Sequence, residues 1–153
     1  METQDVASCP LTKGERMLVA IDGSKCSEHA VDQAISLGGM CNSTIYLLSV
    51  VDIQAEHMSD APYLVDKLTQ QAKSYLEQAQ QKVEKANISC EAIIHTGSKP
   101  HEFIVKEAKD RNVDLIVLGT HGRTGVKHFL LGSVAQKVVG FAPCPIMIIP
   151  AAA

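Results

Sequence analysis

Apolar runs alternate with amphipathic stretches along the chain. Five short runs, rich in aliphatic and β-branched residues, predict strands at residues 16–22, 43–52, 88–97, 113–119 and 144–150. Four longer stretches carry apolar residues at steps of three and four and predict helices at residues 24–39, 63–86, 98–112 and 133–141. Strands and helices are therefore expected to alternate from the first strand to the last.

A few residues mark where the predicted helices begin and end. Gly38 and Gly39 predict the end of the first helix. Ser98 is the expected N-cap of the third helix, with Pro100 close to its first turn. The strand at 88–97 is more polar than the others, which favours a place near an edge of the sheet.

The predicted strands are mostly apolar throughout, a pattern typical of a parallel sheet covered by helices on both faces. We therefore predict a single α/β domain over residues 16–150 with right-handed crossovers. Residues 1–15 mix acidic, polar, proline and glycine positions, and we expect a flexible tail that is not a signal peptide. The longest apolar runs have six to eight residues and are too short to span a membrane.

Composition narrows the class of protein further. The 153 residues are 46% hydrophobic and 20% charged, with a net charge of −3, which is ordinary for a soluble globular protein and argues against a basic nucleic-acid surface. The five cysteines are odd in number and form no CxxC pair, so they indicate neither a zinc ribbon nor a disulfide framework. A reducing cytosol fits this usage, and the expected location is cytoplasmic.

The segment "GTHGRTGVKHFLLGS", residues 119–133, joins a predicted buried strand to a predicted helix. Its glycines are Gly119, Gly122, Gly125 and Gly132, and its basic or imidazole residues are His121, Arg123, Lys127 and His128. Glycines let a ligand approach the backbone and allow positive φ where amides turn inward together. Ser133 is expected at the start of the helix, where unpaired N–H groups and the helix dipole favour an anion. The segment therefore predicts a phosphate site at the carboxyl ends of the strands.

Other interpretations of these residues exist. The glycine segment could be a long surface connection, although its glycine spacing and helix start favour a phosphate site. It is not a Walker loop, because no lysine precedes Ser133, and only Gly23 of a dinucleotide fingerprint follows the first strand. Asp22 has two interpretations that the residues leave open: a ligand for a bound molecule, or the Asx-type residue that turns the chain after the first strand.

The segment "GTHGRTGVKHFLLGSVAQKVVGFAPCPIMII" closely resembles the nucleotide-binding branch of the universal stress protein family. The family pattern is glycine, two residues, glycine, nine residues, then glycine with serine or threonine, matched here by Gly119, Gly122, Gly132 and Ser133. The stretches "MLVAIDGS", "YLLSVVD" and "HTGSKPHEFIVKEAKDRNVDLIVLG" are also similar, so the resemblance runs from about residue 16 to residue 150. It implies a five-stranded parallel sheet of order 3-2-1-4-5, similar to adenine nucleotide alpha hydrolases.

The resemblance also implies ATP as the ligand, and the nucleotide itself could bring Mg²⁺. Asp22 is expected at the ribose or adenine end of the nucleotide. The adenine side is expected to contact Ala20, Val50 and Leu118, and some relatives have proline where this chain has Ala20. The ribose and phosphates are expected to contact Gly119, His121, Gly122, Gly132, Ser133 and Val134.

The last strand suggests a partner. The run from Pro145 to Ile149 is apolar at every position and would leave an exposed edge if it lies last in the sheet, so we expect a homodimer that pairs these strands, as the resemblance also implies.

Three functions follow as hypotheses. A nucleotide-binding regulatory protein of the stress response is favoured over turnover, because no clear general base stands beside the glycine segment. A slow ATPase or phosphotransfer enzyme would use the same pocket, with His121 or Ser133 near the γ-phosphate. A nucleotide-free interaction module would bind no ATP.

Overall fold

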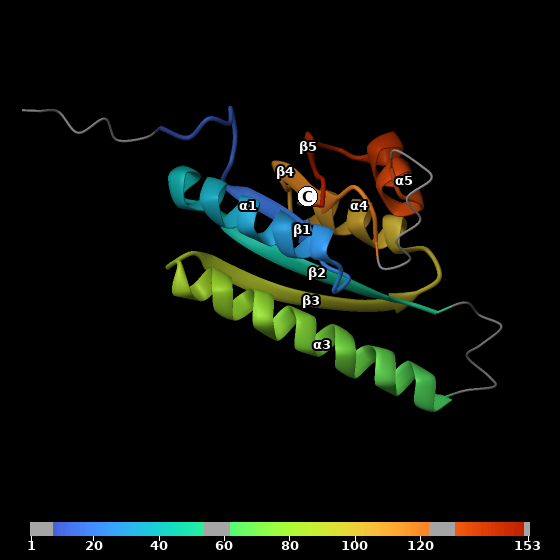
Figure 1. The fold of residues 1–153 in the computed structure, drawn as a ribbon. Helices are drawn as coiled ribbons and strands as arrows, with labels where there is room; N and C mark the ends of the chain where they lie inside the picture. Colours follow the sequence, from blue (N-terminus) through green and yellow to red (C-terminus); the bar gives the residue numbers. More distant parts are fainter. Residues whose placement is uncertain (1–7, 54–61, 123–130, 152–153) are drawn as a thin grey trace, which may run out of the picture.

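A computed structural model describes residues 8–53, 62–122 and 131–151 of the chain. The described residues form five strands and four helices (Figure 1). The elements are β1 (Arg16–Ala20), α1 (Lys25–Cys41), β2 (Thr44–Asp52), α3 (Pro62–Lys85), β3 (Ser89–Gly97), α4 (Pro100–Asp110), β4 (Leu115–Gly119), α5 (Ser133–Phe141) and β5 (Ile146–Ile149). The predicted alternation of strands and helices is confirmed.

The five strands form one parallel sheet of order β3-β2-β1-β4-β5. This order confirms the predicted topology, and it places the more polar β3 at an edge as expected. Met17 of β1 lies opposite Ile45 of β2 on one side and Leu115 of β4 on the other. The chain moves from β1 toward β3, returns to β4 beside β1, and then moves outward to β5, so the crossovers part between β1 and β4.

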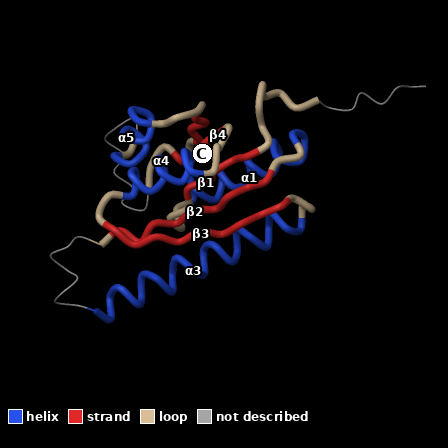
Figure 2. The backbone as a smooth tube through the Cα atoms, turned by 180° about the vertical axis from the view of Figure 1, so that it is seen from behind, coloured by secondary structure: helices blue, strands red, loops and turns tan. Residues whose placement is uncertain are grey.

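Helices cover both faces of the sheet. Figures 1 and 2 show α3 running beside β3, and α4 and α5 together on the side away from it. Successive side chains of β1 point to opposite faces of the sheet and belong to two apolar clusters. Met17 and Val19 pack with residues of α1 and α3, whereas Leu18 packs with residues of α4 and α5. All three side chains are fully buried. None of the described helices combines the length and apolarity needed to cross a bilayer.

The first helix is longer than predicted. It continues through Gly38 and Gly39 to Cys41, and Asn42 ends it in the left-handed conformation with φ of 52°. Gly38 is buried, and a Cβ there would lie 3.2 Å from Cδ1 of Ile45. Gly38 is therefore a packing residue within the helix, and the prediction that it ends the helix is wrong.

The start of α4 also differs from the prediction. Lys99 occupies the N-cap position rather than Ser98, and no side chain caps the helix there. Pro100 stands in the first turn, where its missing N–H leaves no helical bond unmade. The proline therefore contributes more to this helix start than the expected serine cap.

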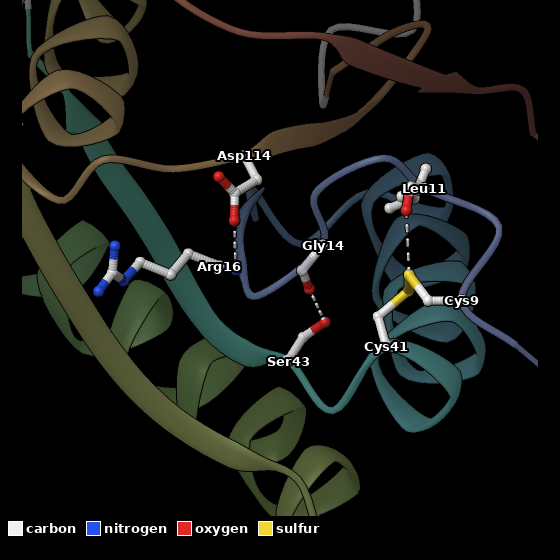
Figure 3. Close-up of a disulfide and its surroundings, with 7 residues drawn as sticks. All are labelled: Cys9, Leu11, Gly14, Arg16, Cys41, Ser43 and Asp114. Atoms are coloured by element: carbon white, nitrogen blue, oxygen red, sulfur yellow. Dashed lines mark hydrogen bonds between the residues drawn. A yellow bond between two sulfur atoms is a disulfide. The ribbon is translucent and has the colours of Figure 1, made fainter.

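A disulfide between Cys9 and Cys41 joins the segment before β1 to the end of α1 (Figure 3). The two Cα atoms lie 4.5 Å apart, and 32 positions separate the residues in sequence. This bond corrects the expectation drawn from the cysteine count: an odd number of cysteines argues against a fully paired framework but permits a single bridge. Within the part of the chain that the structure describes, Cys26, Cys90 and Cys144 are free.

Hydrogen bonds hold the rest of this segment against the sheet. The hydroxyl of buried Ser43 donates to the carbonyl oxygen of Gly14, and the amide of Thr44 donates to the carbonyl oxygen of Glu15 at 2.8 Å. The amide of Arg16 donates to Oδ2 of Asp114 at 3.1 Å. Residues 9–15 of the predicted tail are thus fastened at the amino ends of the strands.

Candidate functional site

A cavity of about 620 Å³ lies at the carboxyl ends of β1, β2 and β4. This is the position where ligands bind in open parallel sheets, because neighbouring crossovers part there. The ten residues named from the sequence resemblance all line this single cavity: Ala20, Asp22, Val50, Leu118, Gly119, His121, Gly122, Gly132, Ser133 and Val134. Their contact with a nucleotide stays a prediction.

Asp22 lies two residues after the end of β1, where the chain turns into α1. Its Oδ1 accepts a hydrogen bond from the amide of Ser24 at 2.9 Å, which is an Asx-type turn. Its Oδ2 faces the glycine segment, since a Cβ built on Gly122 would lie 2.7 Å from that oxygen. The turn interpretation of Asp22 therefore holds, and the same carboxylate also lines the cavity.

The glycines of the segment are needed for close approach. A Cβ on Gly119 would lie 2.4 Å from Cβ of Cys26, so β4 can meet α1 only through a glycine. The expectation of positive φ is wrong for the loop glycines that the structure describes, because Gly23 is the only described glycine with that conformation. Gly125 lies outside the described residues.

The first turn of α5 opens on the cavity. The helix begins at Ser133 as predicted, and Gly132 is its N-cap, with no side-chain hydrogen bond to the turn. The amide of Gly132 donates to the carbonyl oxygen of Thr120 at 2.6 Å, which fixes the helix start against the end of β4. The first amides of a helix are not used by its own carbonyl groups, so an uncapped start favours an anion.

Charged groups around the cavity are few among the described residues. His121 lies 3.0 Å through Nδ1 from Oγ1 of Thr120, and both line the cavity. Burial raises the pKa of Asp52, which lines the cavity at the end of β2. The other positive residues of the segment, Arg123, Lys127 and His128, lie outside the described residues. No cluster of three His, Cys, Asp or Glu side chains that could hold a metal occurs within 8–53, 62–122 and 131–151.

Several lining residues were not predicted. Thr120 and Ser24 are hydroxyl residues inside the two motifs that were used, so the motifs themselves could have found them. Further lining residues come from elsewhere: Ser49 of β2, Pro100 and Ile104 of α4, and Leu68, Ala72 and Tyr75 of α3. Ser49, Pro100 and Ile104 lie within stretches that carry the family resemblance, whereas the three residues of α3 lie outside them and reach the cavity through the packing of that helix.

The model of the universal stress protein family matches residues 14–150. The chain belongs to the universal stress protein family. It is 32% identical over 145 residues to universal stress protein YxiE of Bacillus subtilis, a match that covers 88% of this chain and 97% of the relative. A solved structure of protein MJ0577 is 31% identical with a TM-score of 0.82, covering 89% of this chain and 95% of that one.

Two more distant structures of the family contain adenine nucleotides. A protein of Arabidopsis thaliana with AMP bound is 22% identical, with a TM-score of 0.68 and coverage of 91% of this chain and 93% of that chain. A universal stress protein in complex with cAMP is 22% identical, with a TM-score of 0.69 and coverage of 92% and 100%. At this identity the likeness to this chain concerns the fold.

Proposed function

We propose that this chain binds an adenine nucleotide, with ATP as the first candidate, and acts as a regulatory protein of the stress response. The observation that carries the proposal is that the uncapped start of α5 and the carboxylate of Asp22 line one cavity. A helix start favours phosphate, and a carboxylate accepts hydrogen bonds from ribose hydroxyls. Adenine nucleotides in two structural neighbours support the ligand class.

In this proposal, different lining residues would hold the phosphates, the ribose and the base of ATP. Ser133 and Val134 would offer backbone amides to the phosphates from the first turn of α5. Asp22 would hold the ribose, while its other oxygen keeps the turn to Ser24 in place. Ala20, Val50 and Leu118 would provide apolar surface for the base, since all three belong to or pack against one apolar cluster. Mg²⁺ would arrive with the phosphates, and it would shield their charge.

Binding rather than turnover is the proposed role of the site. Hydrolysis requires a positioned water and support for the leaving phosphate. His121 is the described imidazole in the cavity, and its hydrogen bond with Thr120 orients it there. A slow ATPase that uses His121 or Ser133 is the second candidate, favoured by this orientation.

The decisive experiment is calorimetric titration of purified protein with Mg-ATP, together with a phosphate-release assay. We expect saturable binding without sustained release. Gly132→Val should abolish binding, because a Cβ there would already lie 3.2 Å from the carbonyl oxygen of Thr120 and further methyl groups would crowd the helix start. Gly39→Val is the matched control, since no atom other than those of its chain neighbours and its own helix backbone lies within 4 Å of its added Cβ. Sustained release lost in Gly132→Val would favour the ATPase, and no binding at millimolar ATP would refute both.

We also propose that two copies pair through β5. This strand is bonded to β4 only, so its outer edge has no partner strand among the described residues. Val139 and Phe141 of α5, the helix that precedes β5 in the chain, are 51% and 66% exposed and add to the exposed apolar surface. Light scattering should give twice the mass of the 16.5 kDa chain, and a monomer at working concentration would refute the pairing.

The cytoplasm is the proposed location, and the Cys9–Cys41 bond provides a way to test it. Cytosolic thiols are normally kept reduced, so a stable bond there would be unusual. Trapping of free thiols in freshly broken cells, followed by mass spectrometry, should find both cysteines reduced if the protein is cytoplasmic. A fully oxidised pair would argue for another compartment.

A further inference from the structure

The cavity has a second part that none of the predicted nucleotide contacts uses. Three of its lining residues come from α3, which covers the face of the sheet opposite to α4 and α5. We call this part the α3 arm, and it is formed by Ile21, Ser49, Val51, Leu68, Ala72 and Tyr75.

Alternation along β2 assigns the cavity residues to two faces. Leu47 belongs to the cluster that packs with α1 and α3, and Val51 packs with Ala72 of α3. Ser49 lies between them at the same phase, so its side chain points to the α3 face. Leu48 and Val50 point the other way and pack in the cluster of α4 and α5. The α3 arm and the proposed adenine surface therefore lie on opposite faces of the sheet.

Ser49 places an unused hydroxyl in this arm. The residue is only 3% exposed, and its Oγ has no hydrogen bond to any part of the chain that the structure describes. Among the described residues, every fully buried side-chain nitrogen or oxygen atom has a hydrogen-bond partner, so the Oγ of Ser49 is not fully buried. The Oγ must therefore reach open space, and the open space beside Ser49 is the cavity that it lines.

Tyr75 bounds the arm on the side of the β1 loop. A Cβ built on Gly23 would lie 2.5 Å from Cζ of Tyr75, so the aromatic ring rests directly on that glycine. Gly23 also has φ of 81°, which a larger residue adopts only with strain. The ring and the loop are thus held together, and Tyr75 gives the arm a flat aromatic wall.

We propose that the α3 arm is a second binding site for a small uncharged ring that carries one hydrogen-bonding atom. Val51, Leu68 and Ala72 supply apolar surface, and Tyr75 supplies a ring to pack against. None of the six residues of the arm is charged, so an ionic group would lose its hydration there without a counter-charge. The Ser49 hydroxyl, which has no partner among the described residues, favours one polar atom on the ligand. The site does not depend on phosphate, so it goes beyond the proposed nucleotide binding.

The test uses phenol and toluene as probes of the same shape, one with a hydroxyl and one without. Both are titrated into the full chain, and the methyl signals of Val51, Leu68 and Ala72 are followed by NMR. We expect both probes to shift these signals, with phenol the tighter binder. Ser49→Ala should weaken phenol about two- to tenfold, the effect of one buried hydrogen bond, and leave toluene unchanged. Ser74→Ala on the exposed side of α3 is the matched control and should change neither probe.

Three results would overturn the proposal. If neither probe shifts the three methyl signals, the arm accepts no ring. Equal weakening of phenol and toluene in Ser49→Ala would show that the hydroxyl is not a ligand. Displacement of phenol by saturating ATP would show that the arm belongs to the nucleotide site. Ala72→Leu, which fills the arm, should block both probes and leave ATP binding intact. If ATP does not bind at all, the proposed function fails, whereas the phenol result still decides this proposal.

Discussion

The two ends of the sheet are built differently. At the amino ends of the strands, the Cys9–Cys41 bond and hydrogen bonds to Gly14, Glu15 and Arg16 fasten the incoming chain to its neighbours. At the carboxyl ends, the chain leaves a cavity of about 620 Å³ whose walls come from seven elements and the loops between them. One end therefore uses its polar groups within the chain, whereas polar groups at the other end line the cavity.

This difference separates stability from binding. Changes at the amino ends should lower the free energy of unfolding without altering nucleotide affinity, because they lie at the far end of the strands from the cavity. Changes at the carboxyl ends should alter affinity first, except where a residue also packs between elements. The predictions below test this separation in order of decreasing effect.

Loss of the disulfide should have the largest effect on stability. A bridge across 32 positions is expected to stabilise the fold by about 3 to 4 kcal/mol through the entropy of the unfolded chain. Dithiothreitol reduces the disulfide by thiol–disulfide exchange and is itself oxidised, so it should lower the melting temperature by about 10 °C.

Cys9→Ser supplies the control for this experiment. The variant should melt at the lower temperature with or without the reductant, and its affinity for ATP should equal that of the wild type. If the reductant does not change the melting temperature of the wild type, the disulfide does not stabilise the amino ends of the strands.

Gly119→Ala should lower stability although the residue lines the cavity. The added Cβ would lie 2.4 Å from Cβ of Cys26 and 3.1 Å from its backbone carbon, so β4 and α1 must separate. Such overpacking costs about 1 to 3 kcal/mol, measured by urea unfolding. Gly39→Ala, with open space around its Cβ, should be neutral or slightly stabilising. Equal effects of the two substitutions would show that the glycine is not needed for packing.

Asp22→Asn should separate the turn from the proposed ribose contact. Asparagine can still accept the amide of Ser24, so stability should hold. The loss of charge should weaken ATP about tenfold by calorimetry, because hydrogen bonds to a charged acceptor are the stronger ones. Asp66→Asn on the exposed surface of α3 is the control. An unchanged affinity in Asp22→Asn would leave Asp22 as a turn residue alone.

The smallest effect on stability is expected from the loss of the ion pairs that Glu107 forms. Glu107 of α4 pairs with His95 of β3 at 2.8 Å and with Arg111 at 2.7 Å. Burial would raise the pKa of Glu107, but hydrogen bonds from Arg111 and His95 outweigh it and lower the pKa below 4.5. A lowered pKa stabilises the fold above the unfolded value, and this contribution is lost as the pH falls through the folded value.

Glu107→Gln should therefore lower the free energy of unfolding by less than about 1 kcal/mol at pH 7. In strong acid, where Glu107 is protonated, the variant and the wild type should be equally stable. Urea unfolding at pH 7 and pH 3 measures the difference. Glu102→Gln, on the same helix but 61% exposed through its side chain, should behave as the wild type. A difference that persists unchanged at pH 3 would rule out the charge as the cause.

The fold could be predicted almost completely from the sequence, and the site only in part. Ala20, Asp22 and Val50 lie within two residues of the carboxyl end of a strand, so a strand pattern and a parallel sheet suffice to bring them together. Ser49 could not be found in this way, because a serine inside an apolar strand carries no sign that its hydroxyl lacks a partner. Tyr75 and Ala72 resemble ordinary core positions of an amphipathic helix, and only the angle of α3 against β2 brings them to the cavity.

The cysteines show the same division. Their number and spacing exclude a CxxC motif, but the pairing of Cys9 with Cys41 depends on where α1 ends relative to the incoming chain. That end was misplaced because Gly38 resembles a helix stop, whereas its contact with Ile45 makes it part of the core. A glycine can be needed for backbone freedom or for close packing, and the sequence alone does not show which of the two applies.

By itself, the sequence determined the alternation of strands and helices, the parallel sheet and the place of the phosphate-favouring helix start, because these depend on periodicity and on residues close together in the chain. The tertiary structure alone decided the disulfide, the close contact of Gly119 with Cys26 and the α3 arm around Ser49. Those features depend on distances between elements far apart in sequence, and such distances are set by the packing of the whole core.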